Sequence, residues 1–314
     1  MLLIYKNLRG VKMAKKENKY KDYNKHKDTY RPSGLAEFFG LGRPIDFYSY
    51  PTRLALLFSI LTCVAEVVYQ GTFNSAGSSE ALTMGANVGL SFLFCFFIAA
   101  ELDPDRRVGG LIGGFLSAIG VHLLGEGNII VLLWLLWILR MLNRTAGDRH
   151  RMVDDFIIIG CAAYLGIKEF WLYPLLTGAA YVVESQLPAG FFGSYFLAAI
   201  SLGSTYFANK TNEVPSLSLL YIYMGAIAFI LFLPELRVAS FCQALGDKDG
   251  QPLYKTRVMA AQGCFVLILL SLITLHGDKQ ALTNLPAIMA ATGAGAYLLY
   301  DLMIHKPYDN LKRR

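Results

Sequence analysis

The chain has 314 residues, of which 54% are hydrophobic and only 17% are charged, and its mean hydropathy is +0.42. Soluble globular proteins carry nearer a quarter of charged residues, so this composition excludes an ordinary soluble domain and indicates a polytopic membrane protein. We expect the lipid bilayer to be its main partner and expect no nucleic-acid partner, although the net charge is +6.

The first 45 residues are predicted to form a basic, largely disordered cytoplasmic tail. Ten of the 29 Lys and Arg residues lie between Lys6 and Arg31, in a stretch without apolar periodicity. The tail could rest on anionic lipid headgroups, where each basic residue contributes about 1 kcal/mol. A solvated tail without a partner is the alternative. Met13 is a second candidate start of the chain.

Residues 46–306 are predicted to form a transmembrane helical domain, and residues 307–314 a short basic cytoplasmic tail. A helix needs roughly 20 apolar residues to cross the ~30 Å hydrocarbon layer. The fold class is therefore predicted to be all-α, a polytopic bundle of about ten spans with both termini cytoplasmic. The expected spans are 54–70, 82–100, 108–124, 128–142, 154–168, 170–187, 190–208, 216–234, 257–275 and 284–304.

The loops carry the orientation signal. With this threading, 26 of the 29 basic residues lie on one side, and only Lys168, Lys210 and Lys279 lie on the other. Basic residues accumulate on the cytoplasmic side of membrane proteins. Residues 154–187 could form one long helix or two helices hinged at Lys168 and Glu169, and two helices fit the charge distribution better. We expect an integral protein of a prokaryotic cytoplasmic (inner) membrane, with an oligomer or a larger membrane complex left open.

The third expected span is dense in glycine, with residues 109, 110, 113, 114 and 120. Glycines spaced by four lie on one helix face and let a neighbouring backbone approach closely. This pattern favours tight packing, and a mobile or dimerising helix is the alternative.

Two polar stretches on the predicted cytoplasmic side are candidate sites. In the first, Glu101, Asp103 and Asp105 could hold Mg²⁺ or another hard cation through oxygen ligands, and Arg106 and Arg107 could bind phosphate. In the second, Arg140 and Arg144 lie one turn apart and could meet those acids. The alternative is structural: the arginines are a topology signal, and the acids neutralise them.

Ionisable residues inside a span are expensive, and they are functional candidates by default. Glu66 and His122 are the nearest to such positions, both toward the outer half, and they could share a cavity. Lys168, Glu169, Glu184 and Asp301 lie near the predicted helix ends.

The sequence leaves three functions open. The first is a transporter or permease for a small solute or ion, in which Lys168 and Glu169 line or gate the path and Glu66 or His122 relays protons. The second is a membrane-embedded, metal-dependent enzyme acting on a phosphorylated or isoprenoid lipid at the cytoplasmic face, the only case that implies a cofactor, Mg²⁺. The third is a non-catalytic membrane subunit or scaffold. The sequence does not decide whether the protein is an enzyme.

Overall fold

A computed structural model describes residues 38–42, 47, 49–125, 127–210 and 216–304, and these residues form an all-helical fold, as the composition predicts. No strand occurs among them, and the only β-type pairing there is an isolated bridge between Leu245 and Pro252. The predictions for residues 1–37 of the basic tail and for the tail 307–314 lie outside the described residues. Residues 38–42, which belong to the predicted tail, are described, and Leu41 is fully buried.

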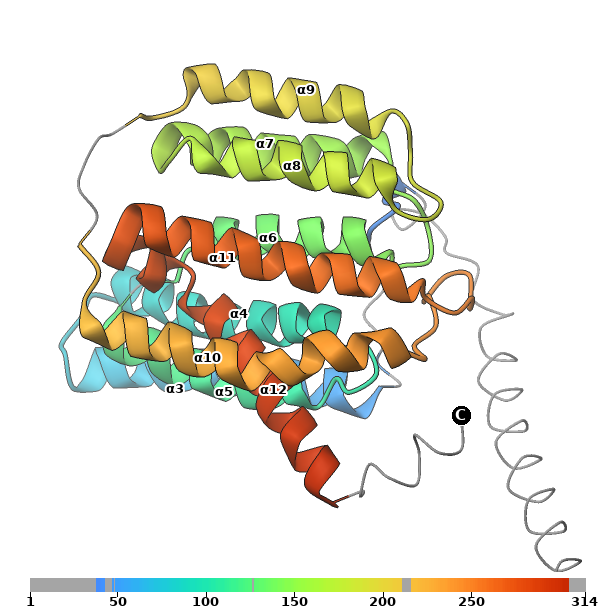
Figure 1. Ribbon diagram of the computed structural model, residues 1–314. Coiled ribbons are helices and arrows are strands. Elements are labelled where there is room, and N and C mark those ends of the chain that lie inside the picture. Colours follow the sequence, from blue (N-terminus) through green and yellow to red (C-terminus); the bar gives the residue numbers. More distant parts are fainter. Residues whose placement is uncertain (1–37, 43–46, 48, 126, 211–215, 305–314) are drawn as a thin grey trace, which may run out of the picture.

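The helices follow the expected spans in order, and they are labelled as in Figure 1. The break in the doubtful segment falls between Lys168 and Leu172, so residues 154–187 belong to two helices. Pro174 is tolerated there because it lies in the first turn of the second helix. The α-helices are α3 (Tyr50–Thr72), α4 (Ser78–Leu102), α5 (Gly109–Leu124), α6 (Ile129–Asn143), α7 (Met152–Lys168), α8 (Leu172–Gln186), α9 (Ser194–Ser204), α10 (Leu219–Val238), α11 (Lys255–Thr283) and α12 (Leu285–Ile304), with single 3₁₀ turns η1 (Thr205–Phe207) and η2 (Ala239–Phe241).

Five of the described helices are long and apolar enough to cross a membrane: α3, α4, α10 with η2, α11 and α12. The apolar helices α5 and α6 are shorter. At a rise of about 1.5 Å per residue, the 15 residues of α6 extend for roughly 22 Å, less than the ~30 Å hydrocarbon layer. Length and composition therefore support five spans directly, which is fewer than the sequence predicts.

Successive helices run in alternate directions, so their loops gather at two ends of the bundle (Figure 1). We call one of them the arginine end; it comprises loops 103–108, 144–151, 187–193 and 242–254. The opposite end comprises the described residues of the loops at 73–77, 125, 127–128, 169–171, 205–210 and 216–218. At the opposite end the described residues include only three Lys or Arg side chains: Lys168, Lys210 and Lys279.

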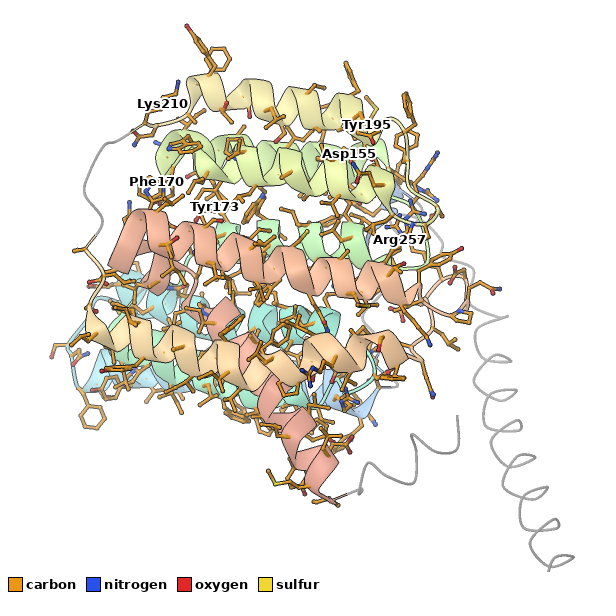
Figure 2. The ribbon with its side chains drawn as sticks, in the orientation of Figure 1. Asp155, Phe170, Tyr173, Tyr195, Lys210 and Arg257 are labelled. Atoms are coloured by element: carbon orange, nitrogen blue, oxygen red, sulfur yellow. The ribbon has the colours of Figure 1, made fainter. Side chains whose placement is uncertain are left out.

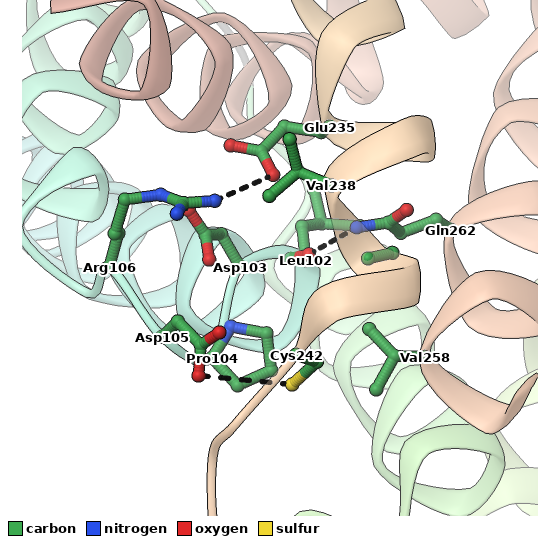
Figure 3. Close-up of a pocket in the computed structure, with 11 residues that line it drawn as sticks. Leu102, Asp103, Pro104, Asp105, Arg106, Glu235, Val238, Cys242, Val258 and Gln262 are labelled. Atoms are coloured by element: carbon green, nitrogen blue, oxygen red, sulfur yellow. Dashed lines mark hydrogen bonds and ion pairs between the residues drawn. The ribbon is translucent and has the colours of Figure 1, made fainter. Parts of the chain in front are cut away.

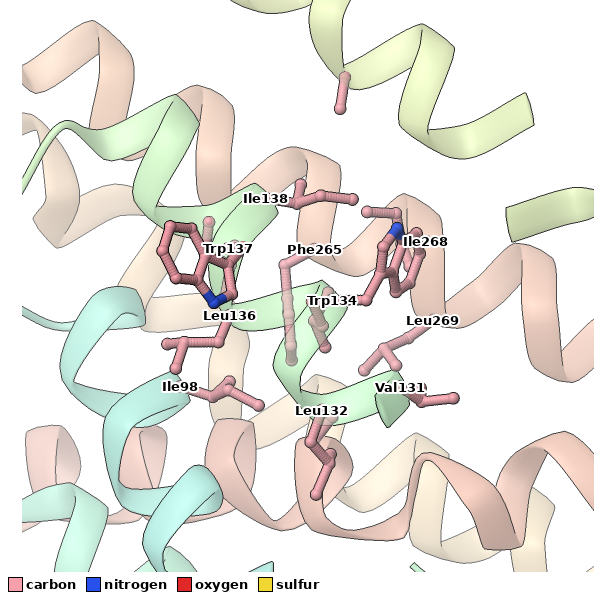
Figure 4. Close-up of a cluster of buried hydrophobic side chains, with 14 of the residues drawn as sticks. Ile98, Val131, Leu132, Trp134, Leu136, Trp137, Ile138, Phe265, Ile268 and Leu269 are labelled. Atoms are coloured by element: carbon pink, nitrogen blue, oxygen red, sulfur yellow. The ribbon is translucent and has the colours of Figure 1, made fainter. Parts of the chain in front are cut away.

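Helix α6 lies at the centre of the bundle and is its most buried helix. It begins where the Asn128 side chain accepts hydrogen bonds from the backbone N–H groups of Ile130 and Val131, which a helix start leaves unpaired. Its indoles pack among branched side chains from α4 and α11 (Figure 4). Trp134 donates to Thr177 Oγ1 at 2.8 Å, so even this buried N–H is paired.

The glycines of α5 let two neighbouring helices approach closely, which confirms the packing prediction. Gly110 and Gly114 lie against Phe96 and Phe92 of α4. On the other face, Gly109 and Gly113 meet α12 at Gly293, and a Cβ on Gly293 would overlap the backbone of both.

We expect Gly293→Leu to destabilise the protein by about 1–3 kcal/mol, because an added side chain in a close-packed interface forces the helices apart. The measurement is the thermal unfolding of the detergent-solubilised protein. Gly160→Leu on α7 is the matched control, since nothing lies within 4 Å of a Cβ built there. Equal unfolding temperatures for the two variants would contradict this account of α5–α12 packing.

Candidate functional site

The arginine end holds most of the buried charge of the described residues. Figure 2 shows Asp155 and Arg257 at this end, whereas Phe170, Tyr173 and Lys210 lie at the opposite one. The helices end here among polar side chains from several loops, so backbone groups that the helix ends leave open are paired by side chains.

Glu184, near the end of α8, is fully buried and clamped between two guanidinium groups. Arg144 Nη2 lies 2.9 Å and Arg257 Nη2 3.1 Å from Glu184 Oε1. The other oxygen accepts from Ser194 Oγ at 2.6 Å and from the backbone N–H of Phe191 at 3.2 Å. One carboxylate thus joins α8 to α9, to α11 and to the loop after α6.

Arg257 also closes the end of α6. Its Nη1 donates to the carbonyl of Leu142 at 2.9 Å and to that of Met141 at 3.3 Å, and its Nε donates to the carbonyl of Pro188 at 2.8 Å. The last carbonyls of a helix have no partner within the helix and carry partial negative charge. The buried guanidinium of Arg257 supplies hydrogen-bond donors to these carbonyls and a positive charge beside their partial negative charge.

His150 joins the same cluster in an arrangement that resembles a Ser–His–Asp triad. Its Nδ1 lies 2.7 Å from Asp155 Oδ1, and its Nε2 lies 3.2 Å from Ser194 Oγ. Tyr181 also donates to Asp155 Oδ1, at 2.8 Å.

The charge state of His150 argues against nucleophilic catalysis by this cluster. Burial by itself lowers the pKa of His150. The hydrogen bonds and negative charges of Asp155 and Glu184 outweigh this effect and raise the pKa from 6.5 to about 9. A protonated imidazole cannot take a proton from Ser194, whose hydroxyl is already donated to Glu184. The cluster is therefore a buried ion network that holds the helix ends together.

The three acids predicted as one metal site are separated in the structure. Glu101 pairs with Arg140, with Oε1 3.2 Å from Nε, and also accepts from Thr145. Asp105 accepts from the backbone N–H of Gln243. Asp103 pairs with Arg106, so the three carboxylates have different partners and do not converge. Among the described residues, no three His, Cys, Asp or Glu side chains lie close enough to hold a metal ion.

Each of the four arginines in the two candidate stretches has a carboxylate partner. The expected contact between the second polar stretch and the acids is formed once, by Arg140 and Glu101. These guanidinium groups are therefore neutralised within the protein. The pairs are Arg106 with Asp103 and Glu235, Arg107 with Asp247, Arg140 with Glu101, and Arg144 with Glu184.

Asp103 and Arg106 lie in a pocket at the arginine end together with Glu235 of α10 (Figure 3). Arg106 Nε is 2.7 Å from Asp103 Oδ2, and Arg106 Nη2 is 3.5 Å from Glu235 Oε2. Asp103 is 4% exposed and Glu235 only 1%. Gln262 of α11 also lines the pocket and donates to the carbonyl of Leu102 at 2.7 Å.

Burial and charge oppose each other at Asp103. Burial has the largest effect and raises the pKa of Asp103, and the nearby Asp105 raises it further. The positive charge of Arg106 and a hydrogen bond with Glu235 lower this pKa only in part, so it stays above its usual range. Burial lowers the pKa of Arg106, but the charges of Asp103 and Glu235 outweigh it and raise that pKa overall. Two acids thus share one guanidinium in a buried pocket.

Glu66 of α3 and His122 of α5 meet at the opposite end, as their expected depth implies. His122 Nδ1 lies 2.7 Å from Glu66 Oε2. Gln70 donates to Glu66 Oε1 at 2.7 Å, and Asn74 donates to Gln70 Oε1 at 2.7 Å. Glu66 and Gln70 are buried, whereas the side chain of His122 is 32% exposed, so this polar chain reaches the surface of the bundle.

Lys168 and Glu169 lie at the junction of α7 and α8 at the opposite end. Lys168 is exposed, whereas Glu169 pairs with Lys279, with Oε2 2.8 Å from Nζ. The structure therefore separates these two neighbours: one faces outward and the other joins α11.

Sequence reasoning assigned no role to Glu235 or Arg257, and it noted Glu184 only as one of several ionisable candidates within the predicted spans or near their ends. The signal for Glu235 and Arg257 is their position: each is a charged residue within a long apolar helix. Glu235 follows Pro234 inside an apolar helix, and Arg257 lies in the first turn of another. Buried charges are rare unless they are paired, so an acid and a base at such positions call for partners.

The five long apolar helices define an integral membrane protein of the all-helical class. No known family, curated protein or solved structure shows significant similarity to the chain. Its function therefore has to be argued from these residues.

We expect Glu184→Gln to destabilise the protein by about 3–5 kcal/mol, because it leaves the buried guanidinium of Arg257 and the largely buried one of Arg144 facing a neutral side chain. Thermal unfolding in detergent measures the effect. The control is Asp148→Asn, which breaks a half-exposed pair with Arg151 and should cost about 0–1 kcal/mol. A Glu184→Gln protein as stable as the control would refute the clamp.

His150 should make stability depend on pH. Its folded-state pKa, raised to about 9, lies above the ordinary value of 6.5, so its contribution is complete below pH 6.5 and disappears as the pH rises through 9. Unfolding temperatures recorded across this window should fall with pH in the wild-type protein. His150→Gln should flatten the fall, and an unchanged slope in that variant would assign it to another group.

Proposed function

We propose that this protein is a membrane permease that moves a small solute or ion and carries an ion-binding step at the pocket of Asp103, Arg106 and Glu235. The observation that supports this most is that two buried carboxyl groups share one partly exposed guanidinium in a pocket at the arginine end of the bundle. Ionisable groups at such positions are costly, and in membrane proteins they mark ion and substrate pathways.

The proposal includes ten membrane crossings, with both chain ends on the cytoplasmic side. The alternating directions of α3–α12 and the charge difference between the two ends support it. Helices shorter than the hydrocarbon layer are admissible where neighbouring helices surround them, and α6 is enclosed in this way. We place the arginine end in the cytoplasm, where basic loops accumulate.

The pairing of the arginines favours a permease over an enzyme acting on a phosphorylated lipid. Such an enzyme needs guanidinium groups that face a ligand, whereas the candidates at this end already bind carboxylates of the chain. The divergence of Glu101, Asp103 and Asp105 likewise offers no common metal site.

Cysteine labelling tests the ten crossings. With the five native cysteines replaced by serine or alanine, Gly77→Cys and Lys210→Cys should react with an impermeant maleimide added outside sealed, right-side-out vesicles. Asp148→Cys should react only after the vesicles are opened, because it lies at the arginine end. Opened vesicles control for burial, since all three positions should then be labelled. Labelling of Asp148→Cys from outside would contradict the threading.

Capacitive currents on solid-supported membranes test the permease itself. Proteoliposomes holding the full chain are exposed to sudden steps in H⁺ or Na⁺ concentration, with empty liposomes as the blank. We expect a step current that Glu235→Gln largely abolishes, because the variant removes a buried acid from the pocket. Glu80→Gln, an exposed acid in the first turn of α4, is the matched control and should keep the current. Reconstituted protein that responds to neither ion would overturn the proposal.

A further inference from the structure

The pocket contains an excess of negative charge that the Glu184 cluster lacks. Around Glu184, two arginines and a protonated His150 face two carboxylates. In the pocket the carboxylates outnumber the cations, because Asp103 and Glu235 share the single guanidinium of Arg106. Two ionised carboxylates there would leave one negative charge uncompensated in a medium of low dielectric constant.

The other groups that face the pocket do not supply the missing positive charge. From the α4–α5 loop comes the exposed Asp105, which adds a further negative charge. After η2 comes Cys242, whose thiol pKa is raised to about 11 chiefly by burial, so the thiol is neutral. Helix α11 contributes only the uncharged Val258 and Gln262.

Two oxygen atoms in the wall of the pocket lack hydrogen-bond partners. These are Glu235 Oε1 and Gln262 Oε1, which are unpaired among the described residues, and both side chains are only 1% exposed. Buried polar atoms are nearly always paired, so unpaired acceptors in a pocket wall point to a donor that binds there. The donor must be small, since the cavity of about 10 Å³ has room for roughly one water molecule.

We infer that Asp103 and Glu235 together bind one proton, which neutralises the excess charge and is the coupling ion of the permease proposed above. A proton suits the pocket better than a metal cation does. Hard cations take six or more oxygen ligands, and one placed here would lie within a few ångströms of the Arg106 guanidinium. The proton enters from the arginine end, where Asp105 is exposed and Arg106 is partly exposed.

Infrared difference spectroscopy of the purified full chain tests the shared proton without requiring transport. A pH step should reveal the C=O stretch of a protonated carboxylic acid that shifts in D₂O and disappears on alkalinisation. Either Asp103→Asn or Glu235→Gln should abolish this band, because the remaining carboxylate then pairs with Arg106 alone. Glu80→Gln should retain it.

Arg106→Gln separates proton sharing from a purely structural ion pair. Without the guanidinium, both buried acids should be protonated, and the band should grow about twofold. A band that survives in both single-acid variants, or one that does not grow in Arg106→Gln, overturns the inference. Loss of the band on adding Na⁺ at constant pH would assign the site to sodium and overturn it as well.

The inference depends on the proposed function only for its coupling role, and the two can fail separately. A titrating band without ion-step currents leaves the proton site standing and removes the permease. Currents without the band leave the permease standing and remove the proton site. Where a variant elutes as aggregate, the band of the other acid variant and of Arg106→Gln decides the outcome.

Discussion

The buried carboxylate of Glu184 is the interaction on which the architecture of the arginine end depends. It meets Arg144 from the loop after α6, Arg257 from α11 and Ser194 from α9. A lone carboxylate at this depth would severely destabilise the fold, whereas Glu184 is paired with cationic and neutral donors on all sides. The same Arg257 closes the carbonyl end of α6, the central helix. Helix termini and charges are thus satisfied by one set of contacts.

Two kinds of buried polar site follow from this comparison. In the Glu184 network the carboxylates are saturated with donors, and such a network holds helices in place. The pocket of Asp103, Arg106 and Glu235 is unsaturated, with one guanidinium for two acids and unpaired oxygens in its wall. The saturated site is suited to structure and the unsaturated one to binding. This difference, rather than the number of charges, favours the pocket as the functional site.

Part of the site could be predicted from local pattern. Depth along the helices brought Glu66 to His122. Glu101 and Arg140 could be matched because both lie at the arginine end, on helices that only α5 separates in the chain. The set of Glu101, Asp103 and Asp105 could not be resolved in this way. Their alternation was interpreted as a common site, but Glu101 ends a helix while Asp103 and Asp105 lie in a turn, so their side chains point toward different neighbours. Glu235, more than a hundred residues away, could be placed there only by the packing of α10.

The sequence by itself determined the all-helical class, the order of the helices, the break before Leu172 and the close packing of the α5 glycines. These features depend on hydropathy, on residue size and on neighbours a few positions apart, all of which are visible along the chain. Only the tertiary structure decided which charges are neutralised and which are left in excess. Charge balance in a buried site is a sum over residues from separate helices, and that sum is defined only when the helices have packed.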